Sequence, residues 1–563
     1  MYLQEMKKQI EQVLNDKYLL SIVLQINLKE DKFDFFLPLF NYVKILNKKI
    51  LEIFKDFQKA LTKNTEIDNI FFQNGFLNIK LKRVNFSQKI LLNVLDSGHN
   101  YCQKDINYQT IVLDYSSPNI AKNFSIGHLR STIIGNALKK IYQKLGFKTV
   151  SINHLGDWGT QFGKMILAYR KWAKQENMIQ NPLNELQRVY VLFHQEALKD
   201  EKLNEEARQI FYLLENKDKE ITDLWNWFKK ISLKEFYKIY DLLGVSFDYY
   251  LGESFFHDKA TELLEELKDK NLIVLDDEAY IMTLDKDIPP VLIQKKNGST
   301  LYLTRDIACV LYRYHTFNFD KCLYVVGNEQ KLHYQQLQLV IDKIGYKKLK
   351  LEHINFGLVL FHNMKISTRQ SNSFSLIDII NKAQKEVQNI IKNKHFDPEK
   401  IHTISQKIAI GAVVFNDLKN DRHLDIDFNL DAMLKFEGNT GPYLQYTVVR
   451  FNSIIHKIAF DSCEFTKHDF NVYYQQFHYY VLIRLIDQFD VILEKVKEAN
   501  MPSILARYLF QLAKCANKFY EKEKILNIND LTLQYANILL IKNFLIVLKE
   551  GLNILGVPIL EQM

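Results

Sequence analysis

The 563 residues carry 74 basic and 66 acidic side chains, and the resulting net charge of +8 is too modest to predict nucleic-acid binding by itself. Hydrophobic residues make up 47% of the chain and no Ser/Gly-rich or Pro-rich linker occurs, so we expect roughly two to four domains packed against one another. The five cysteines form no C-x-x-C pair, which argues against structural zinc and a disulfide framework and is typical of a reducing, cytoplasmic compartment.

The first 100 residues mix helical and strand-like patterns. IEQVLNDKYLLSIV (10–23) has helical periodicity and FLNIKLKRV (76–84) alternates, which predicts a small α+β domain over residues 1–100. The start of the chain carries acidic side chains and no apolar signal core, so we expect neither a secretory signal nor a transit peptide.

From residue 109 the pattern changes to apolar runs followed by polar turns and helices. TIVLDYSS (110–117), the helix beginning near His128 and KTVSIN (148–153) predict a βαβ unit with a parallel sheet. Residues of about 165–250 are charged and helical, and strand-like segments return in CLYVVG (322–327) and INFGLVLF (354–361). We therefore expect an insertion within one nucleotide-binding sheet.

Helical periodicity continues from about residue 400 to the end, as in LARYLFQLAKCANKFYEK (505–522), and predicts an all-α domain. The apolar run YANILLIKNFLIVLKE (535–550) contains Lys542 and is too short to span a bilayer. We expect a buried helix there and no membrane partner.

The turn after the strand TIVLDYSS carries residues suited to a triphosphate. His128 stands where a helix begins, and a helix N-terminus favours anions, with His128 and Lys122 as further donors. Gly127 has no Cβ, so a flat base could approach the backbone. A single Gly-His pair also occurs at ordinary turns between a strand and a helix, so this pattern alone leaves both interpretations open.

The longer segment SSPNIAKNFSIGHLRSTIIGN (116–136) resembles the signature of arginyl-tRNA synthetases, including their version of the class I H-x-G-H motif. Further segments agree in order: HLGDWGTQFG (154–163), LYLTRDIA (301–308), FEGNTGPYLQY (436–446) and LARYL (505–509). The resemblance implies a multidomain α/β protein. Its expected parts are the N-terminal domain, a Rossmann-like parallel-sheet catalytic domain over 101–400 with insertions at about 165–250 and 254–300, and an all-α anticodon-binding domain over 401–563.

The resemblance also implies a reaction. The carboxylate of L-arginine attacks the α-phosphorus of ATP to give arginyl-adenylate, and the 3′-terminal adenosine of tRNA(Arg) then takes the arginyl group, with release of AMP and pyrophosphate. Mg²⁺ is expected with ATP, held mainly by phosphate oxygens and water rather than by a dedicated protein site. The family further implies a monomer.

At the ATP end, the resemblance assigns Lys122, Ser125, Gly127 and His128 to phosphate and adenosine binding. MKISTRQ (364–370) resembles the family's K-M-S-K-S region, whose working residues here would be Lys365, Ser367, Thr368 and Arg369. Ser125 replaces the first histidine of the motif. A hydroxyl carries no charge, and losing one such donor costs about 3 kcal/mol, roughly a hundredfold in rate, unless Lys122 compensates.

At the arginine end, a guanidinium requires carboxylates placed to accept its planar fork of donors. By resemblance, Glu253, Tyr302 and Asp306 would face the guanidinium. The polar end and the crevice walls would be formed by Asn119, Gln330, Asp114, Ser117 and His154. For an isolated acid, a helix cap or a surface salt bridge is the commoner role.

The resemblance assigns aromatic residues of the C-terminal helices to unpaired tRNA bases. These residues are Tyr443, Tyr446 and Tyr520, together with the terminal Met563. In the N-terminal domain, Asn78 would contact the tRNA elbow. Ordinary core packing is the alternative for each, because the chain contains 30 Tyr and 38 Phe.

Two other functions remain open at the level of sequence. The change at Ser125 is compatible with a tRNA-binding protein that has lost amino-acid activation. A different H-x-G-H nucleotidyltransferase would not need some 160 helical residues with GNTGPYLQY after the sheet.

Overall fold

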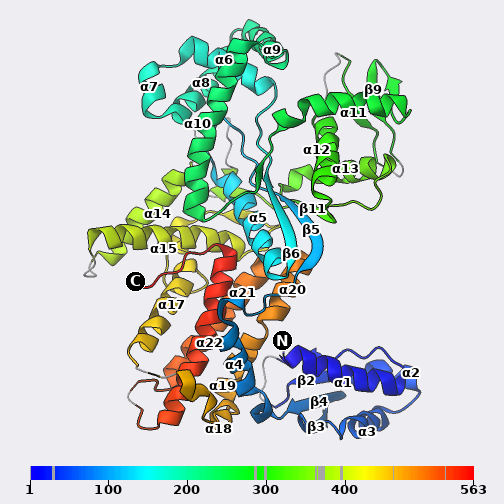
Figure 1. Cartoon of the computed structure of the whole chain (residues 1–563), viewed down its shortest axis with the longest axis vertical. Coiled ribbons are helices and arrows are strands. Elements are labelled where there is room, and N and C mark those ends of the chain that lie inside the picture. The colour runs from blue at the N-terminus through cyan, green and yellow to red at the C-terminus, as the bar shows by residue number, and fades with distance from the viewer. Residues whose placement is uncertain are drawn as a thin grey trace.

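The computed structural model describes residues 2–27, 32–284, 288–296, 301–361, 364–365, 375–392, 397–458, 460, 462–526 and 528–563. A central sheet lies between a helical group above it and the C-terminal helices below it (Figure 1). The N-terminal unit lies beside the lower end of the C-terminal helices, at the lower right of this view.

The N-terminal unit is an antiparallel sheet in the order β1-β2-β4-β3, with two main helices beside it that pack on one another. Its elements are α1 (Tyr2–Tyr18), β1 (Gln25–Ile26), β2 (Phe35–Pro38), α2 (Val43–Leu46), α3 (Ile50–Leu61), β3 (Ile67–Gln73) and β4 (Phe76–Leu81). The strand predicted in 76–84 is confirmed as β4.

Helix α1 ends at Tyr18, earlier than the periodic pattern up to Val23 predicts. The chain turns back along the helix, and side chains of α1 bind its backbone. Asn15 Oδ1 accepts from the Ile22 N–H at 2.6 Å, and Glu11 Oε1 accepts from the Leu24 N–H at 2.6 Å. Ile22 and Leu24 are thus buried in a returning segment and not in another helical turn, whereas Leu19 and Val23 are exposed.

Among the described residues, a five-stranded parallel sheet in the order β12-β11-β5-β6-β7 forms the centre of the molecule. Its strands are β5 (Asn107–Asp114), β6 (Phe147–Asn153), β7 (Tyr249–Tyr250), β11 (Lys321–Tyr324) and β12 (Lys350–His353). Helix α5 (Ile126–Lys144) connects β5 to β6 and completes the predicted βαβ unit. The residues at the inner end of β5 are fully buried, as expected for a central parallel strand.

Two groups of elements are inserted between strands of this sheet, and they form the two upper lobes in Figure 1. The first, between β6 and β7, consists of α6 (Thr160–Trp172), α7 (Gln175–Gln180), α8 (Pro182–Ala197), α9 (Lys202–Glu215) and α10 (Lys219–Leu243). The second precedes β11 and consists of α11 (His257–Asp269), the small sheet β8 (Val274–Asp276), β9 (Ala279–Met282) and β10 (Val291–Gln294), and α12 (Tyr302–Phe317). Helix α13 (Lys331–Lys343) then leads to β12.

The strand predicted over INFGLVLF is wrong for its first half. The sheet strand β12 ends just before it, and residues 354–358 have no strand assignment. The backbone there is bound by other partners: Gly357 O accepts from Arg130, and Leu358 N–H donates to Asp425 Oδ1. The second half forms β13 (Val359–Phe361), which pairs with β14 (Met364–Lys365) and β15 (Ile426–Asp427) in a separate sheet.

The C-terminal region is helical, as predicted. Its helices are α14 (Leu376–Ile391), α15 (Pro398–Leu418), α16 (Leu430–Met433), α17 (Gly441–His456), α18 (Asn471–Tyr474), α19 (Phe477–Asp487), α20 (Phe489–Ala499), α21 (Ser503–Lys522) and α22 (Leu531–Leu555). The buried helix predicted over 535–550 is confirmed within α22, which Asp530 caps and Gly556 ends in the left-handed conformation. In the described part of the chain, every helix is too short or too polar to cross a membrane.

One hydrophobic core extends from the N-terminal unit through α4 (Ser87–Ser97) and α5 into the C-terminal helices. The N-terminal unit is also fixed by polar contacts, because both carboxylate oxygens of Asp487 accept backbone N–H groups at the start of α1, from Tyr2 and Leu3 at 2.8 and 2.9 Å. The N-terminal unit, α5 and the C-terminal helices are thus joined through one shared core.

Candidate active site

Helix α5 begins at the carboxyl end of β5, so its N-terminus points into the crevice where ligands of open parallel sheets bind. Ser125 is the N-cap, and Gly127 is exposed in the first turn. The helix dipole and the N–H groups of this turn favour a bound anion.

His128 is held in one orientation by the cap of its own helix. The Ser125 N–H lies 3.1 Å from His128 Nδ1, and Ser125 Oγ lies 3.2 Å from the same atom. Because Nδ1 accepts the backbone N–H, the proton of the neutral ring is on Nε2. Burial, reinforced by the positive charge of Lys122, lowers the pKa of His128 to about 4. At neutral pH, His128 is therefore an uncharged Nε2–H donor.

Lys122 and Asn123 lie on the side of α5 that faces the inserted helices. Lys122 Nζ is 5.0 Å from the ring centroid of Tyr190 in α8. Asn123 Nδ2 donates to Asn184 Oδ1 at 2.7 Å. The positive charge that reaches the start of α5 is thus positioned by the helical insertion.

Asn119 lies against the segment that follows β6. Asn119 and Gly156 form an isolated parallel bridge, with the Ile120 N–H donating to Gly156 O at 3.2 Å. A Cβ at position 156 would lie 2.1 Å from Asn119 Oδ1, so only glycine permits this approach. The HLGDWG motif therefore fixes the side chain of Asn119 at the floor of the crevice.

Asp114 and Ser117 form a pair at the end of β5. Ser117 Oγ donates to Asp114 Oδ1 at 3.0 Å, and the fully buried Arg313 donates to Asp114 Oδ2 at 2.7 Å. In this structure Asp114 balances the charge of Arg313, and a direct contact with a substrate stays a prediction.

Glu253 is positioned by a buried acid that the sequence analysis did not select. Asp157, fully buried, accepts from the Ser254 N–H and Oγ at 2.8 Å each and from Lys229 Nζ at 2.6 Å. These bonds fix the short helix Glu253–Phe256, and with it Glu253. Beside it, His154 Nδ1 lies 2.8 Å from Leu251 O, which assigns the Nδ1–H donor.

The side-chain carboxyl group of Glu253 is only partly hydrogen-bonded. Its Oε2 is buried and has no hydrogen-bond partner among the residues that the structure describes, and Arg305 Nη2 lies 3.7 Å away. Burial raises the pKa of Glu253 to about 7, although Arg305 opposes this shift. A buried carboxylate oxygen without a partner favours a cationic, hydrogen-bond-donating ligand.

Helix α12 brings an aromatic ring and a second acid to this end of the crevice. Tyr302, at its first turn, is exposed and lies 4.8 Å from the Arg305 guanidinium. Asp306 Oδ2 lies 2.6 Å from His333 Nε2. Gln330 is exposed in the turn before α13. Asn119, His154, Glu253, Tyr302, Asp306 and Gln330 thus come from five separate segments, since Tyr302 and Asp306 share α12.

The predicted loop residues Ser367, Thr368 and Arg369 lie outside the described residues. The backbone of Lys365 is described as part of β14, and its side chain is not. Their predicted role stays a prediction. Among the residues that the structure describes, no group of three or more His, Cys, Asp or Glu side chains is placed to hold a metal ion.

Two of the predicted RNA-contacting tyrosines, Tyr443 on α17 and Tyr520 on α21, are linked through Asn517 and Arg450. Tyr446 is exposed, Tyr443 OH accepts from Asn517 Nδ2 at 2.9 Å, and the Arg450 guanidinium lies 4.4 Å from the Tyr520 ring centroid. Arg450 Nη1 also donates to Asn517 Oδ1 at 3.3 Å. Met563 is nearly buried.

Asn78 lies far from these tyrosines, in a hollow of about 330 Å³ in the N-terminal unit. The hollow combines aromatic rings with side-chain amides, and it is lined by Phe33, Phe36, Phe76, Asn27, Gln73, Asn74 and Asn78. Rings that stack and amides that both donate and accept are suited to an unpaired nucleobase.

Sequence reasoning missed three residues at the arginine end: Asp157, Arg305 and His333. Asp157 and Arg305 lie inside the quoted segments HLGDWG and LYLTRDIA, so their proximity to selected residues was the available signal. Their partners lie tens of residues away, and a single sequence does not reveal such pairs.

Comparisons with known proteins identify the same family over nearly the whole chain. The family model described as "tRNA synthetases class I (R), catalytic domain" matches residues 90–430, and the "DALR anticodon binding domain" model matches residues 444–563. The chain is 42% identical to the arginine–tRNA ligase of an Exiguobacterium species, over 94% of this chain and 93% of that protein. It is 38% identical to the enzyme of the same name from Halothermothrix orenii, over 98% of both chains.

Solved structures show the same fold at lower identity. The arginyl-tRNA synthetase of Thermus thermophilus superposes with a TM-score of 0.84 at 20% identity, covering 100% of both chains. That of Plasmodium falciparum gives a TM-score of 0.83 at 24% identity, covering 100% of this chain and 99% of that one.

Proposed function

Since the chain belongs to the arginyl-tRNA synthetase family of class I enzymes, we propose that the crevice described above is where it activates L-arginine. The protein is an arginine–tRNA ligase. It forms arginyl-adenylate from L-arginine and ATP and transfers the arginyl group to the 3′-terminal adenosine of tRNA(Arg), releasing AMP and pyrophosphate.

The assignment of the arginine site rests on Glu253, because its buried Oε2 has no hydrogen-bond partner in the described part of the chain. A substrate guanidinium donates to this oxygen, and Tyr302 covers its planar face. Asp306 supplies the second negative charge. Asn119 and Gln330 bind the polar end of the amino acid, and the Asp114–Ser117 pair and His154 form the surrounding wall.

The start of α5 binds the phosphates. His128 donates from Nε2, Lys122 adds a positive charge, and Gly127 leaves the backbone open to the adenosine. Lys365, Ser367, Thr368 and Arg369, the last three of which lie outside the described residues, are further phosphate-binding residues of this proposal. No protein nucleophile is required, so catalysis consists of positioning and charge stabilisation. Mg²⁺ bound with ATP neutralises phosphate charge.

Two surfaces receive the tRNA. Tyr446 stacks on an unpaired anticodon base, with Tyr443, Tyr520 and Met563 around it. The hollow that contains Asn78 binds an unpaired base of the tRNA elbow. These surfaces lie on opposite sides of the helical region. We further propose that the enzyme is a cytoplasmic monomer.

The function is tested by charging. Purified protein is incubated with Mg-ATP, tRNA from its source and each labelled amino acid in turn, and acid-insoluble label is measured. The expected result is charging with arginine alone. Charging only by Ser125→His would mean that serine has disabled activation. If neither protein charges tRNA while both still bind it, the proposal is refuted in favour of a binding protein.

A further inference from the structure

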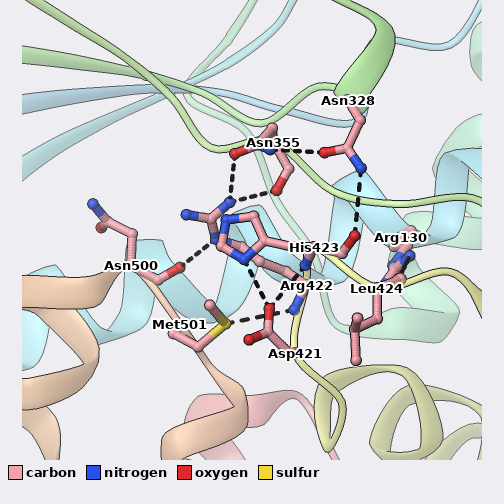
Figure 2. A network of polar contacts seen from close by, with 9 residues as sticks. All are labelled: Arg130, Asn328, Asn355, Asp421, Arg422, His423, Leu424, Asn500 and Met501. Carbon is pink, nitrogen blue, oxygen red and sulfur yellow. Dashed lines mark hydrogen bonds and ion pairs between the residues drawn. The ribbon is translucent and has the colours of Figure 1, made fainter. Parts of the chain in front are cut away.

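Arg422, which the sequence analysis did not select, joins three parts of the molecule through one buried side chain. It lies in the loop after α15 and is 8% exposed (Figure 2). Its Nε donates to Asn500 O at 3.0 Å, and its Nη1 donates to both the backbone oxygen and Oδ1 of Asn355, the latter at 3.0 Å. A single planar guanidinium thus bridges the end of α20 and the end of β12.

On the sheet side, the contact extends to a second strand. Asn355 Nδ2 donates to Asn328 Oδ1 at 2.7 Å, and Asn328 lies in the turn that follows β11. Asn328 Nδ2 in turn donates to His423 O at 3.4 Å, which closes a ring of contacts visible in Figure 2. The loops after two neighbouring strands therefore depend on the segment around Arg422.

The same segment forms the base of the hairpin β13–β14. The Gly357 N–H donates to Arg422 O at 2.9 Å, and the Leu358 N–H donates to Asp425 Oδ1 at 2.6 Å. A Cβ at Gly357 would lie 2.6 Å from the backbone of Leu424, so the two segments touch without space between them. Any displacement of Arg422 therefore moves the start of β13.

Helix α5 contacts this segment from the other side. Arg130, two residues after His128, is 1% exposed and donates from Nη1 to Gly357 O at 2.6 Å and to Leu424 O at 2.8 Å. The base of the hairpin is thus clamped between α5 and the loop of Arg422. The proposed phosphate site lies at the N-terminus of the same helix.

On the side of the C-terminal helices, the residue that Arg422 binds, Asn500, is itself firmly held. Asn500 ends α20 in the left-handed conformation and is 1% exposed. Its Nδ2 donates to Glu352 Oε1 at 2.6 Å and its Oδ1 accepts from Tyr142 OH at 3.0 Å. The turn between α20 and α21 is therefore fixed to both β12 and α5.

We infer that Arg422 is a positioning residue for ATP binding. Its guanidinium holds the start of β13 and the loops after β11 and β12 in register with the N-terminus of α5, and it uses the α20–α21 turn as a fixed support. This inference rests on the proposed function. Only the fork of an arginine reaches Asn355 and Asn500 together, because a lysine has one ammonium group at a single point.

The test measures ATP and L-arginine binding separately, by isothermal titration calorimetry on the full-length protein. Arg422→Lys is expected to weaken ATP binding about tenfold, since charged hydrogen bonds are lost and the phosphate site shifts. Arginine affinity is expected to fall by less than about threefold, because among the residues assigned to arginine only Gln330 lies in a loop that Arg422 supports. The matched control is Arg484→Lys. Arg484 is 2% exposed and binds Asn27 O at 2.6 Å, far from β13, so both affinities are expected to stay within about twofold.

The outcomes distinguish a failure of the inference about Arg422 from a failure of the proposed arginine–tRNA ligase function. A wild type that binds both ligands, with an Arg422→Lys variant that loses neither or loses both equally, overturns the inference alone. A wild type that binds neither ligand overturns the proposed function as well. If circular dichroism shows that Arg422→Lys is unfolded, Asn355→Ala replaces it, and retention of full ATP affinity there overturns the inference.

Discussion

Binding of L-arginine is expected to release a proton from Glu253. Burial raises the pKa of this carboxyl from its ordinary value of 4.5 to about 7, so it is largely protonated in the empty protein at pH 6. The guanidinium supplies donors to the buried Oε2 and stabilises the carboxylate, which lowers the pKa again. Arginine affinity is therefore expected to rise with pH.

The size of the effect follows from the raised pKa. With a pKa of about 7, about one-tenth of Glu253 is ionised at pH 6 and about nine-tenths at pH 8, so the affinity for arginine is expected to increase about tenfold across this range. The same shift bears on stability. Because the folded carboxyl keeps a proton that the unfolded chain has released, Glu253 stabilises the fold fully below pH 4.5. This contribution, ~3 kcal/mol at most, is lost as the pH rises through 7.

The assay is calorimetric titration with arginine at pH 6 and pH 8, each in two buffers of different ionisation enthalpy. At pH 6 the wild type is expected to release close to one proton for each arginine bound, and Glu253→Gln none. Glu262→Gln, an exposed glutamate on α11, serves as the matched control and should behave as the wild type. Equal proton release by the wild type and Glu253→Gln would refute the reasoning.

Three further outcomes are expected. Asp157→Asn removes the charge that holds Ser254. In ATP–pyrophosphate exchange this variant should raise the KM for arginine about tenfold and leave the KM for ATP unchanged. Equal changes in both constants would contradict a role of Asp157 in positioning Glu253. His128→Ala should lower kcat of the same exchange about a hundredfold, and a change of less than about threefold would exclude its Nε2–H as a donor to the transition state. Tyr446→Ala should raise the KM for tRNA in the charging reaction about tenfold. The control is Tyr508→Phe, which changes a buried tyrosine of α21. An equal rise in the KM for tRNA in this control would indicate general instability.

Local signals in the sequence predicted much of the fold. The strand β5, the turn with His128 and the buried helix α22 are contiguous patterns, in which burial and helix capping depend on neighbouring residues. The segment 354–358 looks like a strand because it is apolar, yet Arg130 and Asp425 take its backbone groups. Such competition is invisible in sequence, because it depends on partners from distant parts of the chain.

At the arginine end too, some residues could be selected from local sequence, whereas other features depend on contacts between distant segments. Tyr302 and Asp306 lie in a quoted segment and could be selected from it, but the buried state of Glu253 could not. The short helix that carries Glu253 is fixed by hydrogen bonds from Lys229 and Ser254 to Asp157, and these three residues come from separate segments. Asp114 was selected from its place at the end of β5, whereas its ion pair with Arg313 spans 199 positions and gives no local signal.

The two family models meet between residues 430 and 444, but this is not a place where the protein can be divided. Buried Lys144 of α5 pairs with Glu550 of α22 at 3.0 Å, and Tyr142 of the same helix binds Asn500. A fragment that ends at residue 430 would expose these charged and polar groups together with an apolar face of α5. We therefore expect the separately expressed halves to aggregate, and studies of the anticodon-binding helices to require the full-length chain.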